Sequence, residues 1–149
     1  MSLSLQISDE IKNAMRAKDT VALESLRAIK SAILLAQTET GSKAEIAPED
    51  EIKLLQRLVK QRKDSAKIYT EQGRSDLAEP EIAQAAIIEK FLPQQLSEAE
   101  VSTIIAALIT QNNASGMGDM GKIMAMAATQ LAGKADGKTI STIVKQLLT

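Results

Sequence analysis

The segment from Gly116 to Lys122 has the residue types and spacing of a phosphate-binding loop. It matches G-x-G-x-x-G, a dinucleotide-binding pattern, and G-x-x-x-x-G-K, in which loop amides and a lysine hold phosphate oxygens. The second pattern needs Ser or Thr at the next position to coordinate magnesium, and Ile123 stands there. The first pattern needs a preceding strand, whereas the preceding residues predict a helix. We therefore interpret the segment as a glycine-bearing break followed by a helix start.

Basic side chains recur on one face of the helix predicted over about residues 48–72. At 100° per residue, five of them fall within an arc of roughly 100°: Lys53, Arg57, Lys60, Lys67 and Arg74. Such a stripe could follow a phosphate backbone. The same arc contains two acids, and it is also typical of a solvated face with ion pairs such as Lys60–Asp64 and Lys67–Glu71. Both interpretations stay open, and Lys53, Arg57 and Lys60 are our candidate nucleic-acid contacts in this helix.

Gly133–Lys138 predicts a compact turn that carries Lys134 and Lys138. Asp136 is suited to cap the helix that follows. Lysines beside a helix N-terminus with free amides could contact phosphate. An ordinary turn between two helices would have the same composition.

The composition restricts the chemistry available to the chain. It contains no histidine and no cysteine, so it lacks the usual general base near neutral pH, a reactive thiol, a disulfide and the commonest metal ligand. Lys, Asp and Glu can also catalyse, so this absence does not exclude an enzyme by itself. We name no catalytic residue, metal ligand or cofactor. Tyr69 and Phe91 are the only aromatic residues, too few for base-stacking platforms.

The 149 residues, of which 44% are hydrophobic, predict an all-α protein with an aliphatic core. We predict seven helices: one with a stripe of Leu3, Ile7, Ile11 and Met15; one from Asp19 or Thr20 to before Gly41; about 48–72; Ser75 or Glu79 to Phe91; Ser97 to Gln111; Gly118 or Asp119 to Leu131; and Asp136 or Thr139 to Leu148. Thr40–Ala47 is predicted as the first loop.

Pro93 is predicted to end the first group of helices, because the residue before a proline avoids helical geometry. We expect an N-terminal domain of about four helices, 1–93, and a C-terminal domain of three, 94–149. A strand over Val101–Thr110, which is rich in β-branched residues, is an alternative. The capping box of Ser97 and Glu100 favours a helix there.

Residues 1–9 lack the basic and apolar regions of a signal peptide, and nothing approaches 18 uncharged apolar residues. We therefore expect a cytoplasmic protein without a membrane segment. The formal net charge of −1 argues neither for nor against an anionic partner.

Several segments together resemble the YqeY family: Phe91–Glu100 (FLPQQLSEAE), Asp119–Met124 (DMGKIM), Gly133–Lys138 (GKADGK), Val144–Lys145 and Leu147–Leu148. Each segment is weak alone, but the combination is specific, and the resemblance covers essentially the whole chain. It implies a helical N-terminal domain and a three-helix C-terminal domain. The second is related to the tail domain of the B subunit of the glutamine-dependent aspartyl/glutamyl-tRNA amidotransferase.

The resemblance also implies a role near tRNA, because that tail domain recognises tRNA away from the chemistry. By motif position, the residues implied to face RNA are Lys122, Lys134, Lys138 and Lys145. Family members are also labelled as carbon–nitrogen ligases that use glutamine as amido donor. In the amidotransferase that activity needs a kinase-like cradle domain, for which these helical residues leave no room.

Our leading hypothesis is a non-catalytic accessory protein that binds tRNA. One alternative is an adaptor that binds an aminoacyl-tRNA synthetase or an amidotransferase subunit. Another is a component of a carbon–nitrogen ligase complex that is active only when assembled.

Overall fold

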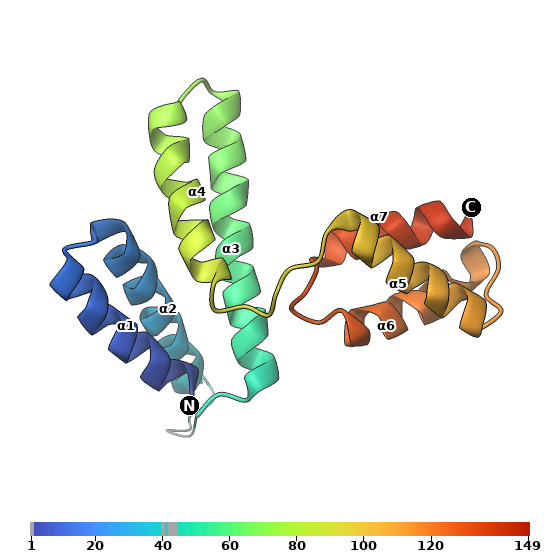
Figure 1. Cartoon of the computed structure of the whole chain (residues 1–149), viewed down its shortest axis with the longest axis horizontal. Coiled ribbons are helices and arrows are strands. Elements are labelled where there is room, and N and C mark those ends of the chain that lie inside the picture. Colours follow the sequence, from blue (N-terminus) through green and yellow to red (C-terminus); the bar gives the residue numbers. More distant parts are fainter. Residues whose placement is uncertain (1, 40, 42–44) are drawn as a thin grey trace. The chain divides into compact units, whose positions relative to one another are not determined.

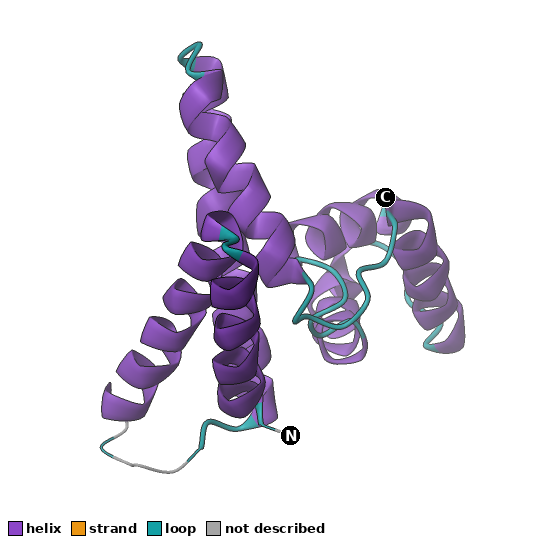
Figure 2. Ribbon diagram, turned by 60° about the vertical axis from the view of Figure 1, so that its left-hand side comes forward, coloured by secondary structure: helices purple, strands orange, loops and turns teal. Residues whose placement is uncertain are grey.

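The computed structural model describes residues 2–39, 41 and 45–149, and in these residues the chain is all-α (Figure 2). The described residues contain a 3-10 helix, η1 (Met117–Asp119), and seven α-helices: α1 (Leu3–Ala17), α2 (Thr20–Glu39), α3 (Pro48–Glu71), α4 (Ser75–Glu89), α5 (Glu98–Gln111), α6 (Met120–Gln130) and α7 (Gly137–Leu148). They include no strand. The predicted fold class is confirmed, and Val101–Thr110 is helical. The predicted loop Thr40–Ala47 lies partly outside the described residues.

The chain divides into two compact units, Met1–Leu92 and Pro93–Thr149, here called unit 1 and unit 2. Each unit has its own cluster of buried aliphatic side chains, and the two clusters share no residue. The division of the chain into two domains that fold independently stays a prediction.

Unit 1 is built from two helical hairpins, α1–α2 and α3–α4, and α2 packs against α4 (Figure 1). The core contains these fully or nearly fully buried side chains: Leu3, Ile7, Leu26, Ile29, Ile33, Leu54, Leu55, Leu58, Val59 and Ile88. Pro48 opens α3, and three acids follow in the first turn, where they match the positive end of the helix dipole.

One residue of the apolar stripe in the first helix is not buried. Met15 is 57% exposed, although it continues the stripe of Leu3, Ile7 and Ile11 in the sequence. A spacing of four residues turns about 40° past a full helical turn at each step. Met15 has therefore drifted away from the face of Leu3 and Ile7, and Ala14 is buried in its place.

A chain of polar side chains joins three helices of unit 1. Nε of Arg62 in α3 donates to Oε1 of Gln84 in α4 at 3.1 Å, and Nε2 of Gln84 donates to Oε2 of Glu24 in α2 at 3.2 Å. Arg62 also donates to the carbonyl oxygen of Leu58. Arg62 therefore serves the packing of unit 1 and does not belong to the solvent face of α3.

Unit 2 is a three-helix unit in which each of α5, α6 and α7 packs against the other two (Figure 1). Its core contains Val101, Ile105, Leu108, Ile123, Ala127, Leu131, Ile140, Ile143, Val144 and Leu148. Ser97 caps α5 by accepting from the amide of Glu100, and Oδ1 of Asp136 caps α7 by accepting from the amide of Thr139 at 2.7 Å. Both helix starts are those that the capping residues predict.

Candidate nucleic-acid interface

The solvent face of α3 carries three of the predicted contact residues, Lys53, Arg57 and Lys60. All three are exposed, and they lie on the side of α3 opposite its buried residues Leu55 and Leu58. Lys60 pairs with Asp64 at 3.3 Å, as expected for an i,i+4 pair, whereas no ion pair joins Lys67 and Glu71, which both lie in the described part. An exposed pair of this kind contributes little to stability. The face is therefore basic but partly neutralised, and both interpretations of the stripe remain compatible with it.

Arg74 does not belong to this stripe, contrary to the prediction. The helix ends at Glu71, and Gly73, with a φ of +73°, turns the chain before α4. The guanidinium of Arg74 then donates two hydrogen bonds to the carboxylate of Asp76, at 3.1 and 3.0 Å. Arg74 would fall in the stripe only if the helix continued past Gly73.

The Arg74 guanidinium holds the pKa of the Asp76 carboxyl below its usual range. A lowered pKa in the folded protein contributes stability above the usual pKa, and this contribution is lost as the pH falls through the lowered value. We expect Arg74→Gln to raise the pKa of Asp76, measured by a carboxyl NMR titration. Lys90→Gln is the control, because it removes a positive charge at the far end of α4. An unchanged Asp76 titration in Arg74→Gln would contradict the assignment.

The glycine-bearing segment before α6 is held by a hydrogen bond between two of its own residues. Oδ2 of Asp119 accepts from the amide of Ser115 at 2.9 Å, and Gly116 has a φ of +68°. A helix, α5, precedes the segment, so the strand required by the dinucleotide pattern is missing from this place. Lys122 lies in the first turn of α6 and is exposed. The interpretation as a break and helix start is confirmed.

The turn between α6 and α7 exposes Lys134 between two buried residues, Gly133 and Ala135. Gly133 has a φ of +76°, a conformation that favours glycine. The amides of Lys134 and Ala135 both donate to the carbonyl oxygen of Leu131. The backbone of the turn therefore faces the core of unit 2, and the Lys134 side chain faces solvent.

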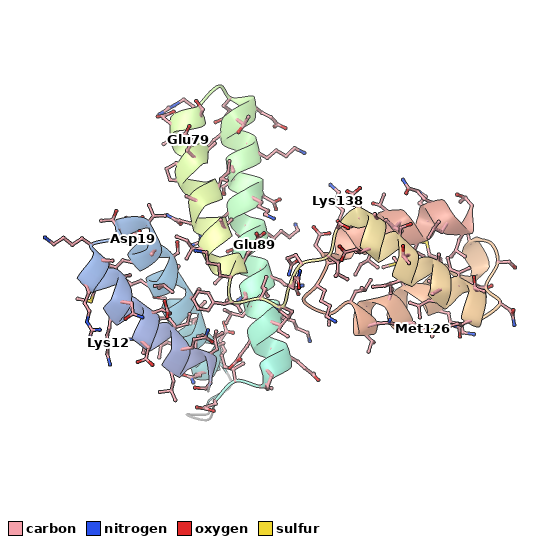
Figure 3. All side chains as sticks on the ribbon, viewed as in Figure 1. Lys12, Asp19, Glu79, Glu89, Met126 and Lys138 are labelled. Atoms are coloured by element: carbon pink, nitrogen blue, oxygen red, sulfur yellow. The ribbon has the colours of Figure 1, made fainter. Side chains whose placement is uncertain are left out.

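Lys138 and Lys145 lie on the same face of α7 (Figure 3 labels Lys138). Seven residues make nearly two helical turns, so the two lysines are about 10 Å apart along the axis. Both are exposed, and Ile140 and Val144 are buried on the opposite side of the helix. Neither lysine forms an ion pair with another of the described residues. Two cations are thus presented to solvent from one rigid element.

Lys134, Lys138 and Lys145 follow one another along the turn and α7, whereas Lys122 lies in the first turn of α6. Lys122 lies near the start of α6, about 12 Å along the helix from Gln130, where α6 ends before the Lys134 turn. Glu98 borders the same shallow depression as Lys138, so an acid also adjoins this surface. We call Lys134, Lys138 and Lys145 the lysine face of unit 2.

The residue Gln95, to which the sequence motifs assigned no role, is hydrogen-bonded through its side chain to the lysine-bearing turn. In the sequence Gln95 stands out only as part of the motif FLPQQL. Nothing in that motif indicates that its side chain contacts a residue 38 positions away.

The described part of the chain offers neither a metal site nor a membrane span. No three acidic side chains gather there in a way that could hold a metal ion. No helix within the same residues is long and apolar enough to cross a membrane.

The fold and these surfaces define a small all-α protein of two helical units, each with exposed lysines on a helix face. Residues 4–148 match the family model of Yqey-like protein, so the chain belongs to the YqeY family. The family resemblance inferred from the sequence motifs is confirmed.

Two kinds of relatives are similar to this chain. Altered inheritance of mitochondria protein 41, mitochondrial, of Lachancea thermotolerans is 33% identical over 109 residues, which cover 70% of this chain and 57% of the relative. The E subunit of glutamyl-tRNA(Gln) amidotransferase of Thermococcus gammatolerans is 44% identical over 71 residues, or 45% of this chain and 11% of the relative. The corresponding protein of Methanococcus maripaludis is 46% identical over 57 residues, 36% of this chain and 9% of the relative. The chain thus spans about a tenth of the amidotransferase subunits.

Proposed function

We propose that this protein is a non-catalytic accessory that binds tRNA, with the lysine face of unit 2 as its main contact. The observation that carries the proposal is the pair Lys138 and Lys145, which are exposed on one face of α7 and form no ion pair within the described residues. Relatives that are named subunits of a glutamyl-tRNA(Gln) amidotransferase point to tRNA as the polyanion. The α3 residues Lys53, Arg57 and Lys60 are a second, separate contact in this proposal, and Lys122 is a peripheral one.

The test is a titration of the purified protein with bulk tRNA at two salt concentrations. Binding by lysine–phosphate contacts releases counterions, so the affinity should fall by about 3-fold per contact between about 50 and 200 mM salt. Poly-glutamate, a polyanion without nucleotides, is the control for attraction to charge alone. Absence of tRNA binding at the lower salt concentration would contradict the proposal.

A second candidate is an adaptor that binds a synthetase or amidotransferase subunit. The observation in its favour is the large apolar side chains that unit 1 leaves exposed, such as Ile68 at 53% and Ile82 at 55%. Capture of such a partner that survives RNase treatment would favour the adaptor, whereas capture that RNase abolishes would favour tRNA binding. Glutaminase activity that appears only with a captured partner would favour the third alternative, a component of a carbon–nitrogen ligase complex.

We further propose that the protein acts in the cytoplasm, since a chain without cysteine suits a reducing compartment. The names of the fungal relatives place those proteins in mitochondria. Fractionation of cells that contain the tagged protein tests this location. Recovery of the protein from an organelle, membrane or extracellular fraction would overturn the cytoplasmic assignment.

A further inference from the structure

Two short segments that are distant in the sequence form one piece of structure at the start of unit 2. Nε2 of Gln95 donates to the carbonyl oxygen of Gly133 and, at 2.9 Å, to that of Pro93. The amide of Leu96 donates to the carbonyl oxygen of Lys134 at 2.9 Å. The segment by which the chain enters unit 2 is thus bonded to the turn that carries Lys134. We call these three hydrogen bonds the Gln95 clasp.

Both partners in this contact are anchored in the core of unit 2. The Leu96 side chain packs against the buried cluster of that unit. On the other side, Gly133 and Ala135 are buried on either side of Lys134. The hydrogen bonds therefore join two segments that each contact the core, and they fix the place from which Lys134 projects.

We propose that Gln95 is a positioning residue for tRNA binding: it holds the Lys134 turn so that Lys134 and Lys138 meet phosphates together. This inference rests on the proposed function, because the position of the turn matters to a ligand only if these lysines contact it. Gln95 itself touches no RNA in this proposal. It acts through the carbonyl oxygen of Gly133.

The physical reason is that one amide group supplies both side-chain bonds. Replacing Gln95 with Met keeps the length of the side chain and removes the donors, so the carbonyl oxygen of Gly133 loses its side-chain partner. The turn then samples more positions, so Lys134 moves independently of Lys138. The two lysines then lose more conformational entropy when they bind one polyanion, which lowers the affinity.

The first arm of the test needs no RNA. In Gln95→Met we expect the amide of Leu96, which donates to Lys134, to exchange with solvent about tenfold faster, because the Gln95 clasp opens locally. The amide of Ile105 inside α5 should keep its exchange rate, which shows that unit 2 is still folded. Gln94→Met is the matched control, since Gln94 is an exposed neighbour whose side chain takes no part in the clasp.

The second arm measures tRNA affinity against salt. Gln95→Met should weaken binding by about fivefold and lower the slope of log affinity against log salt by about one, as expected when one phosphate contact is lost. In a background of Lys134→Ala with Lys138→Ala, the same substitution should have no further effect, because the lysines that it positions are gone. A substitution that only weakened the fold would reduce affinity equally in both backgrounds.

The outcomes separate this inference from the proposed function. If the unaltered protein does not bind tRNA, the proposed function fails and this inference about positioning fails with it, whatever the exchange data show. If tRNA binds and Leu96 exchange is unchanged in Gln95→Met, the clasp is overturned while the proposed function stands. If exchange accelerates and the salt slope is unchanged, Gln95 holds the turn but does not position it for RNA, which also overturns the inference. Gln95→Glu, which places a carboxylate opposite the same carbonyl oxygens, repeats the test should Gln95→Met fail to fold.

Discussion

Replacing Ile105 with alanine should lower the free energy of unfolding of unit 2 by about 2–5 kcal/mol and leave that of unit 1 unchanged. Ile105 has no exposed surface and belongs to the buried cluster of unit 2, which shares no residue with the cluster of unit 1. The lost side-chain atoms leave a cavity in this cluster, and a close-packed core fills such a cavity only partly.

The chain carries a convenient probe for this experiment. Tyr69 is the only tyrosine and there is no tryptophan, so tyrosine fluorescence reports on unit 1 alone, whereas far-ultraviolet ellipticity reports on both units. In a urea titration of Ile105→Ala, the ellipticity should show an early transition that the fluorescence lacks.

The matched variant is Ile29→Ala, which removes an equally buried isoleucine from unit 1. It should shift the fluorescence transition to a lower urea concentration. The ellipticity change from unit 2 should occur at the same urea concentration as in the unaltered protein. Coincident shifts of both probes in both variants would show that the chain unfolds as one cooperative body, and the predicted domains, 1–93 and 94–149, would then be wrong.

Helix positions in this chain follow from local chemistry, and for that reason they could be predicted. Ser97 and Asp136 accept from amides within three residues of themselves, and Gly73 ends the α3 region by its own backbone conformation. Such signals act within one turn of helix, so they do not depend on how the helices pack. The all-α class follows from them together with the aliphatic composition.

Burial and side-chain partners were harder to predict, because they depend on packing between helices. The sequence contains an apolar stripe that includes Met15, but α2 covers the face on which Ala14 lies. Likewise, the bond from Gln95 to Gly133 joins residues 38 positions apart, and it exists only after α6 and α7 have packed. The candidate contact residues of unit 2 came from a family resemblance, and no spacing rule would have separated Lys134 and Lys138 from an ordinary turn.

Removing Lys138 and Lys145 together should weaken tRNA binding by roughly 10- to 100-fold at about 150 mM salt and lower the salt slope by about two. The two side chains share one face of α7 about two turns apart, so each can neutralise a different phosphate. Both are exposed, and replacing them with alanine in a helix should leave the fold intact.

The control for this loss must remove the same charge from a helix that is not proposed to touch RNA. Arg27 and Lys30 meet that requirement, since both are exposed on α2 and neither is part of an ion pair among the described residues. The Arg27→Ala and Lys30→Ala double variant should bind tRNA within about threefold of the unaltered protein, the change expected from net charge alone. Equal losses in the two double variants would mean that tRNA senses only the overall charge. The lysine face of unit 2 would then not be a specific tRNA contact. Loss of a specific contact has to weaken tRNA binding more than loss of the same charge from α2.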